Sequence, residues 1–212
     1  GNQDIMARMW IAASVLQTQA TNPAGATAAV GAYLGAKATA AAGLPLSPTQ
    51  AALLNPAINP LLPYNLDAWD GYPLQREAIL RTFQAQGKRL VTLSGDSHNG
   101  WFSHLTTLGG ARVGVEFAGT SVTSPGIESV GLGGLGSSLD GSVVTGTQGS
   151  GLGLINDLAY ADSARRGYLL LSVKADAITG DYVYVDTVKS NTYTAAVGKT
   201  ITVTAGGDIS YA

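Results

Sequence analysis

A short apolar run near the middle of the chain, "RLVTLS" at residues 89–94, constrains the fold most strongly. Its aliphatic residues fall on both sides of an extended backbone, which is typical of a central strand covered by a layer on each face. In the preceding segment, Ile79 and Phe83 stand four residues apart with Leu80 beside them, as on the buried face of a helix. We therefore expect a helix ending near Gly87, a turn, a buried strand and a loop, in an α/β fold.

The segments on either side of this unit differ in composition. Residues at about 11–60 are rich in alanine but interrupted by glycine and proline, which predicts an excursion of short helices over the surface. One of these helices is expected after Ser47, a favourable N-cap, with Pro48 in its first position. Residues 131–153 are rich in glycine and predict a long surface loop or, alternatively, a repeat of short strands.

The carboxyl-terminal part of the chain is predicted to be rich in strands. "RVGVEFA" at residues 112–118 has the alternation of a strand, and "RGYLLLSVKADAITGDYVYVDTV" predicts two strands around the turn "ADAITGD". "KTITVTAGG" predicts a last strand.

The charge composition argues against a nucleic-acid partner. The formal net charge is −2, and no run of lysine or arginine supplies the attraction that phosphate backbones require. Cysteine is absent, which excludes disulfides and thiolate metal ligands, and no segment approaches the roughly 20 apolar residues of a transmembrane helix. Low lysine with abundant Thr, Ser and Gly favours an exported protein, in the periplasm, at the cell surface or outside the cell.

The loop after the buried strand, "GDSH" at residues 95–98, carries the chemistry of most interest. Ligands bind at the carboxyl ends of such strands, where Gly95 would let the chain turn and present Asp96 and His98 on one side. A carboxylate and an imidazole suit Ca, Mn, Fe or Zn, although further ligands must come from elsewhere. The alternative is a simple turn in which Asp96 makes an Asx hydrogen bond, and His104 is best explained by packing.

Three long motifs occur in order around this loop: "NLDAWDGYPLQREAIL", "LVTLSGDSHNGWFSHL" and "GVEFAGTSVTSPGIES". Together with the later "ARRGYLLLSVKADAITGDYVYVDTV", they resemble the carboxyl-terminal half of the PhoD-like alkaline phosphatases, a branch of the calcineurin-like metallophosphoesterases. The resemblance spans roughly residues 1–10 and 60–190. It implies a four-layer α/β/β/α sandwich, of which residues 1–212 supply the carboxyl-terminal half.

The resemblance also implies a site and a reaction. Asp96 stands where the wider superfamily has the first histidine of its last metal-binding motif, so it would ligate one metal. His98 would ligate the other metal or act in catalysis by contacting substrate. The implied cofactors are divalent or trivalent metal ions, Fe³⁺ and Ca²⁺ by family, with Mn²⁺ or Zn²⁺ as alternatives. The implied reaction is hydrolysis of phosphate monoesters or diesters.

The early motifs of that family have no match in this chain, including those that supply the bridging aspartate and the transition-state arginine. We therefore expect activity only together with an amino-terminal half, present as a separate chain or a missing segment. The alternative is a non-catalytic surface or interaction module that retains the scaffold.

Several other residues in the matched stretches have two interpretations. Asn99 and Trp101 would shape the pocket rim or simply pack, and Glu116 would approach the site or be satisfied by backbone amides. For the segment that precedes the helix, we expect a supporting role through turn hydrogen bonds and aromatic packing. The residues concerned are Trp69, Asp70 and Tyr72.

Overall fold

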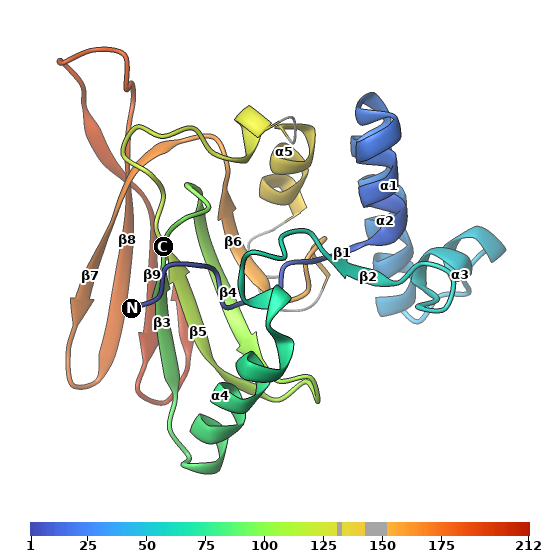
Figure 1. Ribbon diagram of the computed structural model, residues 1–212, viewed down its shortest axis with the longest axis horizontal. Helices are drawn as coiled ribbons and strands as arrows, with labels where there is room; N and C mark the ends of the chain where they lie inside the picture. The colour runs from blue at the N-terminus through green and yellow to red at the C-terminus, as the bar shows by residue number, and fades with distance from the viewer. Residues whose placement is uncertain (131–132, 143–151) are drawn as a thin grey trace.

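The predicted buried strand is present as β3 (Leu90–Ser94) in the computed structural model, which describes residues 1–130, 133–142 and 152–212. β3 pairs in parallel with β5 (Arg112–Ala118), which confirms the strand expected at residues 112–118. The sheet continues antiparallel through β4 (Gly100–Thr106) to β6 (Leu158–Asp162). Its order is β3-β5-β4-β6 (Figure 1).

Among the described residues, β3 lies at the edge of its sheet, so the central position predicted for it is not reached within this chain. Its apolar pattern reflects the coverage of its two faces. Leu90 packs against the core on the helical side, whereas Val91 and Leu93 pack against the second sheet. A strand that is apolar on both faces therefore reports the layers above and below it, and not its neighbours within the sheet.

The second sheet is formed by the carboxyl-terminal part of the chain in the order β10-β9-β8-β7. Its antiparallel strands are β7 (Arg166–Val173), β8 (Ala177–Val185), β9 (Ala195–Thr204) and β10 (Ile209–Tyr211). The predicted strands are confirmed, but the turn between β7 and β8 is shorter than "ADAITGD", and β10 was not predicted. Position 180, inside β8, requires glycine, because a side chain there would collide with the ring of Phe117.

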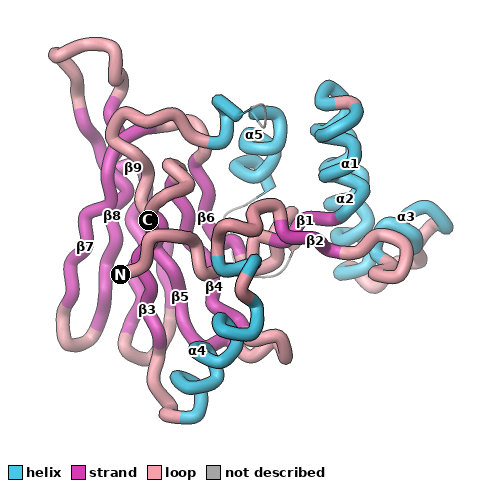
Figure 2. The backbone as a smooth tube through the Cα atoms, viewed as in Figure 1, coloured by secondary structure: helices cyan, strands magenta, loops and turns pink. Residues whose placement is uncertain are grey.

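The two sheets face each other across an apolar core. Phe102, Phe117, Tyr182 and Ile201 are fully buried there, and the rings of Phe102 and Phe117 meet edge to face at 4.7 Å. Figure 2 shows the strands of both sheets grouped on one side of the molecule and the helices on the other.

Helix α4 (Pro73–Ala85) packs on the first sheet and follows the short 3-10 helix η2 (Trp69–Gly71). Leu80 is fully buried, while Ile79 and Phe83 are half-buried, so the predicted face is confirmed and centred on Leu80. Arg76 ties the helix to its surroundings, because its Nε donates to Met6 O at 2.5 Å and its Nη1 to a carbonyl of β4 at 3.0 Å.

Two buried carboxylates hold the first residues of the chain. Glu116 accepts hydrogen bonds from Met6 N at 2.9 Å and Ala7 N at 2.8 Å, which favours the backbone-amide alternative for this residue. Asp70 accepts from Met9 N at 2.9 Å and from the indole of Trp10 at 2.8 Å. Asp70 thus secures the amino-terminal segment, in addition to standing in the η2 turn.

The Trp69 indole likewise reaches the chain start, donating to Asn2 Oδ1 at 3.0 Å. Tyr72 is exposed at 55%, so the aromatic packing expected of it is absent. The expected turn hydrogen bonds at the entry of α4 are present, with Tyr72 N donating to Trp69 O at 3.0 Å, and the segment supports residues 2–10 as well.

The alanine-rich region forms a helical excursion carried on a two-stranded stalk (Figure 1). β1 (Trp10–Ala12) and β2 (Leu61–Pro63) pair antiparallel, and the helices lie between them in sequence. These are α1 (Ala13–Thr21), η1 (Pro23–Gly25), α2 (Ala26–Ala41) and α3 (Pro48–Leu54). The capping box of Ser47 and Gln50 confirms the predicted start of α3. No helix of the described residues is long and apolar enough to cross a membrane.

The glycine-rich region departs from the prediction where it is described. Residues Gly133–Ser142 form α5, after the 3-10 helix η3 (Ile127–Val130), so the expected loop is wrong there. Leu135 and Leu139, four residues apart, are both buried in the helical-side core. Their burial outweighs the poor helix propensity of glycine. Residues 131–132 and 143–151 of the predicted loop lie outside the described residues.

His104 yields a prediction about stability. Its ring is buried in β4 without a hydrogen-bond partner on either nitrogen, and burial, with Arg112 nearby, lowers its pKa to about 4. The unfolded chain therefore binds a proton near pH 6.5, and the folded chain only near pH 4, so stability falls as the pH drops through this window. In urea denaturation, the unfolding free energy of His104→Leu minus that of the wild type should increase by about 2 kcal/mol from pH 7 to pH 5. An advantage independent of pH would contradict the assignment.

Candidate metal centre

The loop after β3 has an unusual backbone. Gly95 was expected to supply the turn, but the left-handed conformation falls on the next residues instead: Asp96 has φ 57° and His98 has φ 59°. Outside glycine this conformation costs free energy, and aspartate and histidine are among the residue types that tolerate it best. Such strain persists where the surroundings enforce it, which is frequent at functional sites.

The segment 119–126 holds His98 in place. The Nδ1 atom of His98 lies 2.8 Å from the carbonyl oxygen of Pro125. The backbone carbonyl of His98 accepts from Thr120 Oγ1 at 3.2 Å and from Ser121 N at 3.3 Å. Because a carbonyl can only accept, Nδ1 must carry the proton, which leaves the Nε2 lone pair available as a ligand. Metal-binding histidines are commonly oriented by this kind of bond.

The remaining residues of the loop are structural. Asn99 is fully buried, donates to Ser163 O at 2.9 Å and accepts from Ile127 N at 3.1 Å. Trp101 is also buried, and its indole donates to Ser97 Oγ at 2.9 Å. Packing is thus the favoured alternative for Asn99 and Trp101, and only Asp96 and His98 are exposed along residues 95–101.

Further acidic groups gather around Asp96. The backbone of Gln3 accepts from Gly95 N at 3.0 Å, which brings Asp4 beside the loop. Burial raises the pKa of Asp4, and repulsion by Asp96 and then Asp67 raises it further. Burial, followed by the charges of Asp96 and Asp70, raises the pKa of Tyr64 to about 12. These shifts indicate a negative potential that a cation would relieve.

Sequence patterns did not predict Asp4 or Tyr64 at this place. No motif links residue 4 with residue 96, and only the backbone pairing beside β3 brings them together. His104 lies apart from the loop, in the inter-sheet part of β4, as the sequence predicted. Among the described residues, no group of three or more His, Asp or Glu side chains has the arrangement of a metal site. Asp96 and His98 are therefore two potential donors that are not joined by a third among the described residues.

Comparison with known proteins assigns the family. The family model described as PhoD-like phosphatase matches residues 1–182, most of the chain. The chain belongs to the PhoD-like phosphatase family. This confirms the resemblance found in the sequence motifs.

Two relatives show how much of a PhoD-like protein this chain represents. Alkaline phosphatase D of Bacillus subtilis (strain 168) is 40% identical over 68 residues, which are 30% of this chain and 12% of that protein. A solved structure described as "Structure of PhoD" matches with a TM-score of 0.52 and 22% identity, over 70% of this chain and 27% of that one. That likeness supports a shared fold. The matched parts cover well under half of either relative's own length.

The His98 hydrogen bond predicts a specific tautomer in this PhoD-like chain. With metal removed and the imidazole neutral, the proton of His98 should reside on Nδ1, opposite to the Nε2–H form that free histidine prefers. Long-range proton–nitrogen NMR spectra report the tautomer directly. The chain has 2 histidines, so His104→Leu leaves one set of ring signals to assign. A proton found on Nε2 of His98 would show that Pro125 does not orient the ring.

Proposed function

We propose that this chain is the carboxyl-terminal half of an alkaline-phosphatase-type enzyme that hydrolyses phosphate monoesters or diesters with the help of metal ions. The observation that carries the proposal is the loop after β3. There Asp96 and His98 are exposed in left-handed conformations, and His98 is oriented through its Nδ1 by Pro125. Membership of the PhoD-like family supports phosphoester hydrolysis as the reaction.

The residues at the loop fit the metal ions that the family implies. Asp96 offers a carboxylate, which suits Ca²⁺ or Mn²⁺ as well as Fe³⁺ or Zn²⁺. His98 offers the Nε2 nitrogen, which suits Fe³⁺ or Zn²⁺ better than the oxygen-seeking Ca²⁺. The neighbouring charge of Asp4 adds to the attraction for a cation. When bound, such ions neutralise phosphate charge and lower the pKa of a bound water.

Within this proposal each residue has a definite task. Asp96 contributes a charged oxygen donor, and its exposure lets further ligands from outside this chain approach the same ion. His98 contributes its Nε2 nitrogen to the second ion or directly to the substrate, as a catalytic residue. Thr120, Ser121 and Pro125 position His98 through its carbonyl and its Nδ1 atom.

A non-catalytic surface module that retains the scaffold is the second candidate. Such a module would retain Asp96 and His98 without activity, and the described residues hold no group of three or more ligand side chains. Measurement of metal content and activity separates the two candidates, because the module would show neither. The composition, low in lysine and rich in Thr, Ser and Gly, is in keeping with an exported location for either one.

Substitution of the loop residues tests the enzyme proposal. In the complete enzyme, Asp96→Asn and His98→Ala should each lower phosphatase turnover by at least about 100-fold, since even the outer partners of metal ligands are worth 10–100-fold. Asp96→Asn should also lower the metal content, because the amide loses the charge that holds the cation. Turnover of a chromogenic phosphate ester and elemental analysis report the two effects.

The matched control is His104→Leu, which alters the other histidine of the chain at a buried position remote from the loop. At pH 8 it should leave turnover within about twofold of the wild type, because surroundings away from the site tolerate such changes. Equal losses in all three variants would indicate general destabilisation and would remove the ligand assignment.

An amino-terminal partner segment is the second part of the proposal, and the open edge of β3 supports it. Beside that edge, Asn2 N donates to Leu93 O at 2.9 Å and Gly95 N donates to Gln3 O at 3.0 Å. This parallel pairing covers only the end of the strand. A further strand would pair with the remainder and would carry the missing ligands.

The second sheet has a comparable open edge at β7. Leu169 and Leu171 face the inter-sheet core, whereas Tyr168 and Leu170 point outward and are 48% and 54% exposed. Figure 1 shows no helix over this outer face. A partner that extends both sheets and adds a helical layer there would complete the four-layer sandwich.

The partner proposal predicts a position-specific loss of stability. In the complete enzyme, Leu170→Lys should lower the unfolding free energy by about 1.5–3 kcal/mol if the partner buries this side chain. Leu44→Lys, at a site 60% exposed near the helical excursion, should change it by less than about 0.5 kcal/mol. Chemical denaturation measures both. Equal, small effects would show that the outer face of β7 stays in water.

A further inference from the structure

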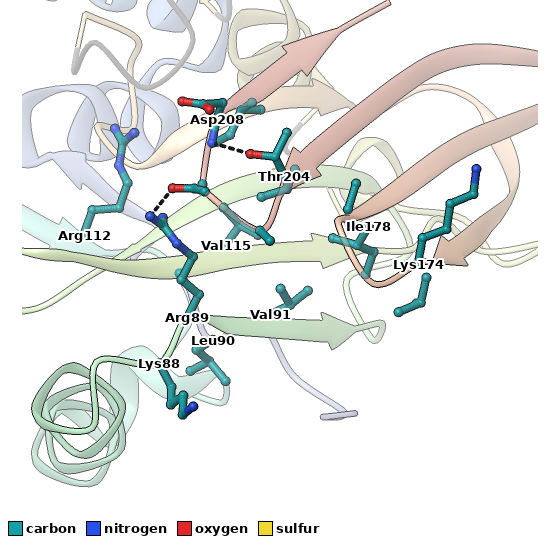
Figure 3. A pocket seen from close by; sticks show the side chains of 18 of the residues that line it. Lys88, Arg89, Leu90, Val91, Arg112, Val115, Lys174, Ile178, Thr204 and Asp208 are labelled. Carbon is teal, nitrogen blue, oxygen red and sulfur yellow. Dashed lines mark hydrogen bonds between the residues drawn. The ribbon is translucent and has the colours of Figure 1, made fainter.

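A cavity of about 740 Å³ opens at the end of β3 opposite to the candidate metal centre (Figure 3). It lies between the starts of β3 and β5 on one side and, on the other, the β7–β8 and β9–β10 turns. Its volume falls within the 300–1,000 Å³ that is common for small-molecule sites. Nothing in the proposed phosphatase reaction uses this cavity.

The walls of the cavity are aliphatic. Val91, Val115, Ile178 and Val203 line it, and all of them also belong to or pack against the inter-sheet core. In Figure 3 the side chains of Val91, Val115 and Ile178 stand around the same space. The cavity is therefore an open extension of the apolar core, and a ligand with a hydrocarbon part would gain by covering it.

The rim carries mainly positive charge. Lys88, Arg89, Arg112 and Lys174 line the cavity, and Asp208 is the acidic residue among its lining. An anionic group would be attracted to this rim, and more strongly beside apolar walls than in open water.

Arg89 is tied to the wall of the cavity by a hydrogen bond. It reaches across from the start of β3 and donates through Nη2 to the carbonyl oxygen of Gly206 in the β9–β10 turn. The next residue, Gly207, has φ 93°, and a side chain there would collide with the Arg89 guanidinium. The turn thus leaves room for Arg89. A guanidinium has five N–H donors, and this bond engages one of them.

We propose that this cavity binds an amphiphilic anion, a ligand with an aliphatic chain and a phosphate, phosphonate or carboxylate head. The chain would cover Val91, Val115 and Ile178, and the head would lie at Arg89, across the aliphatic walls from Lys174 (Figure 3). Inorganic phosphate alone would leave the aliphatic walls in water and would bind much more weakly.

This site is separate from the candidate metal centre. The cavity lies at the start of β3, and the loop that carries Asp96 follows the end of the same strand. At 3.3 Å per residue the two ends are about 20 Å apart. The two sites can therefore be varied independently, and the failure of one proposal does not entail the failure of the other.

The test uses the complete enzyme and decylphosphonate, whose carbon–phosphorus bond resists ester hydrolysis. Calorimetric titration in saturating inorganic phosphate excludes binding at the metal centre. Across the series from hexylphosphonate to decylphosphonate, affinity should rise roughly fourfold for each methylene that is buried, as expected for hydrocarbon that leaves water. An uncharged decyl glycoside should bind at least about tenfold more weakly, because it lacks the charge-assisted contacts.

Matched variants assign the site. Arg89→Glu should weaken decylphosphonate by at least about tenfold, whereas Lys189→Glu, on the exposed turn between β8 and β9, should change it less than twofold. Asp96→Asn should leave this binding intact, which separates the site from the phosphatase proposal. Failure of decylphosphonate to bind the complete enzyme, including closure of the cavity by a partner segment, would overturn the proposal. Equal effects of both charge reversals, or affinity independent of chain length, would also overturn it.

Discussion

The buried carboxylate of Glu116 is the interaction on which the site depends. It lies on β5 and accepts hydrogen bonds from the backbone amides of Met6 and Ala7. It also accepts a hydrogen bond from the Thr92 hydroxyl of β3 at 3.1 Å. Burial raises the pKa of Glu116, and these hydrogen bonds act against that shift by favouring the charged form. One side chain thereby fastens the chain start to two strands. With residues 6 and 7 fixed, residues 2–4 are directed along β3 towards its end, which is how Asp4 arrives beside Asp96.

The sequence predicted the elements around the site better than their arrangement. The apolar run of β3, the amphipathic face of α4 and the cap of α3 each depend on neighbours within a few residues, so local patterns were sufficient. The position of β3 in its sheet depends on β5, 24 residues away, and the contact of Asp4 with the loop depends on residues about 90 positions apart in the chain. No local pattern encodes them. The α5 helix was missed because tertiary burial of Leu135 and Leu139 overrode a glycine-rich composition.

The loop after β3 shows the same difference between what local sequence predicts and what distant residues determine. Its residue types predicted a carboxylate and an imidazole as donors, and the family motifs supplied the roles expected of Asp96 and His98. No local pattern encodes the left-handed conformations at Asp96 and His98, or the contact of His98 Nδ1 with the Pro125 carbonyl, 27 residues away. The surroundings of the two ends of β3 also differ in the sign of their charge. Acidic residues collect beyond its carboxyl end, whereas basic residues surround its start. One strand thus separates the acidic surroundings of Asp96 from the basic rim of the cavity.

The stalk made by β1 and β2 has an evolutionary consequence. Ala12 and Leu61 are directly paired, so the chain leaves and re-enters the body of the protein at neighbouring points. A segment joined in this way can lengthen, shorten or exchange its helices without rerouting either sheet. The constraint comes from burial, because Val15 and Tyr33 share a core with Leu135 of α5. Homologues should therefore diverge most in length at the far end of the excursion and remain conservative where it meets α5.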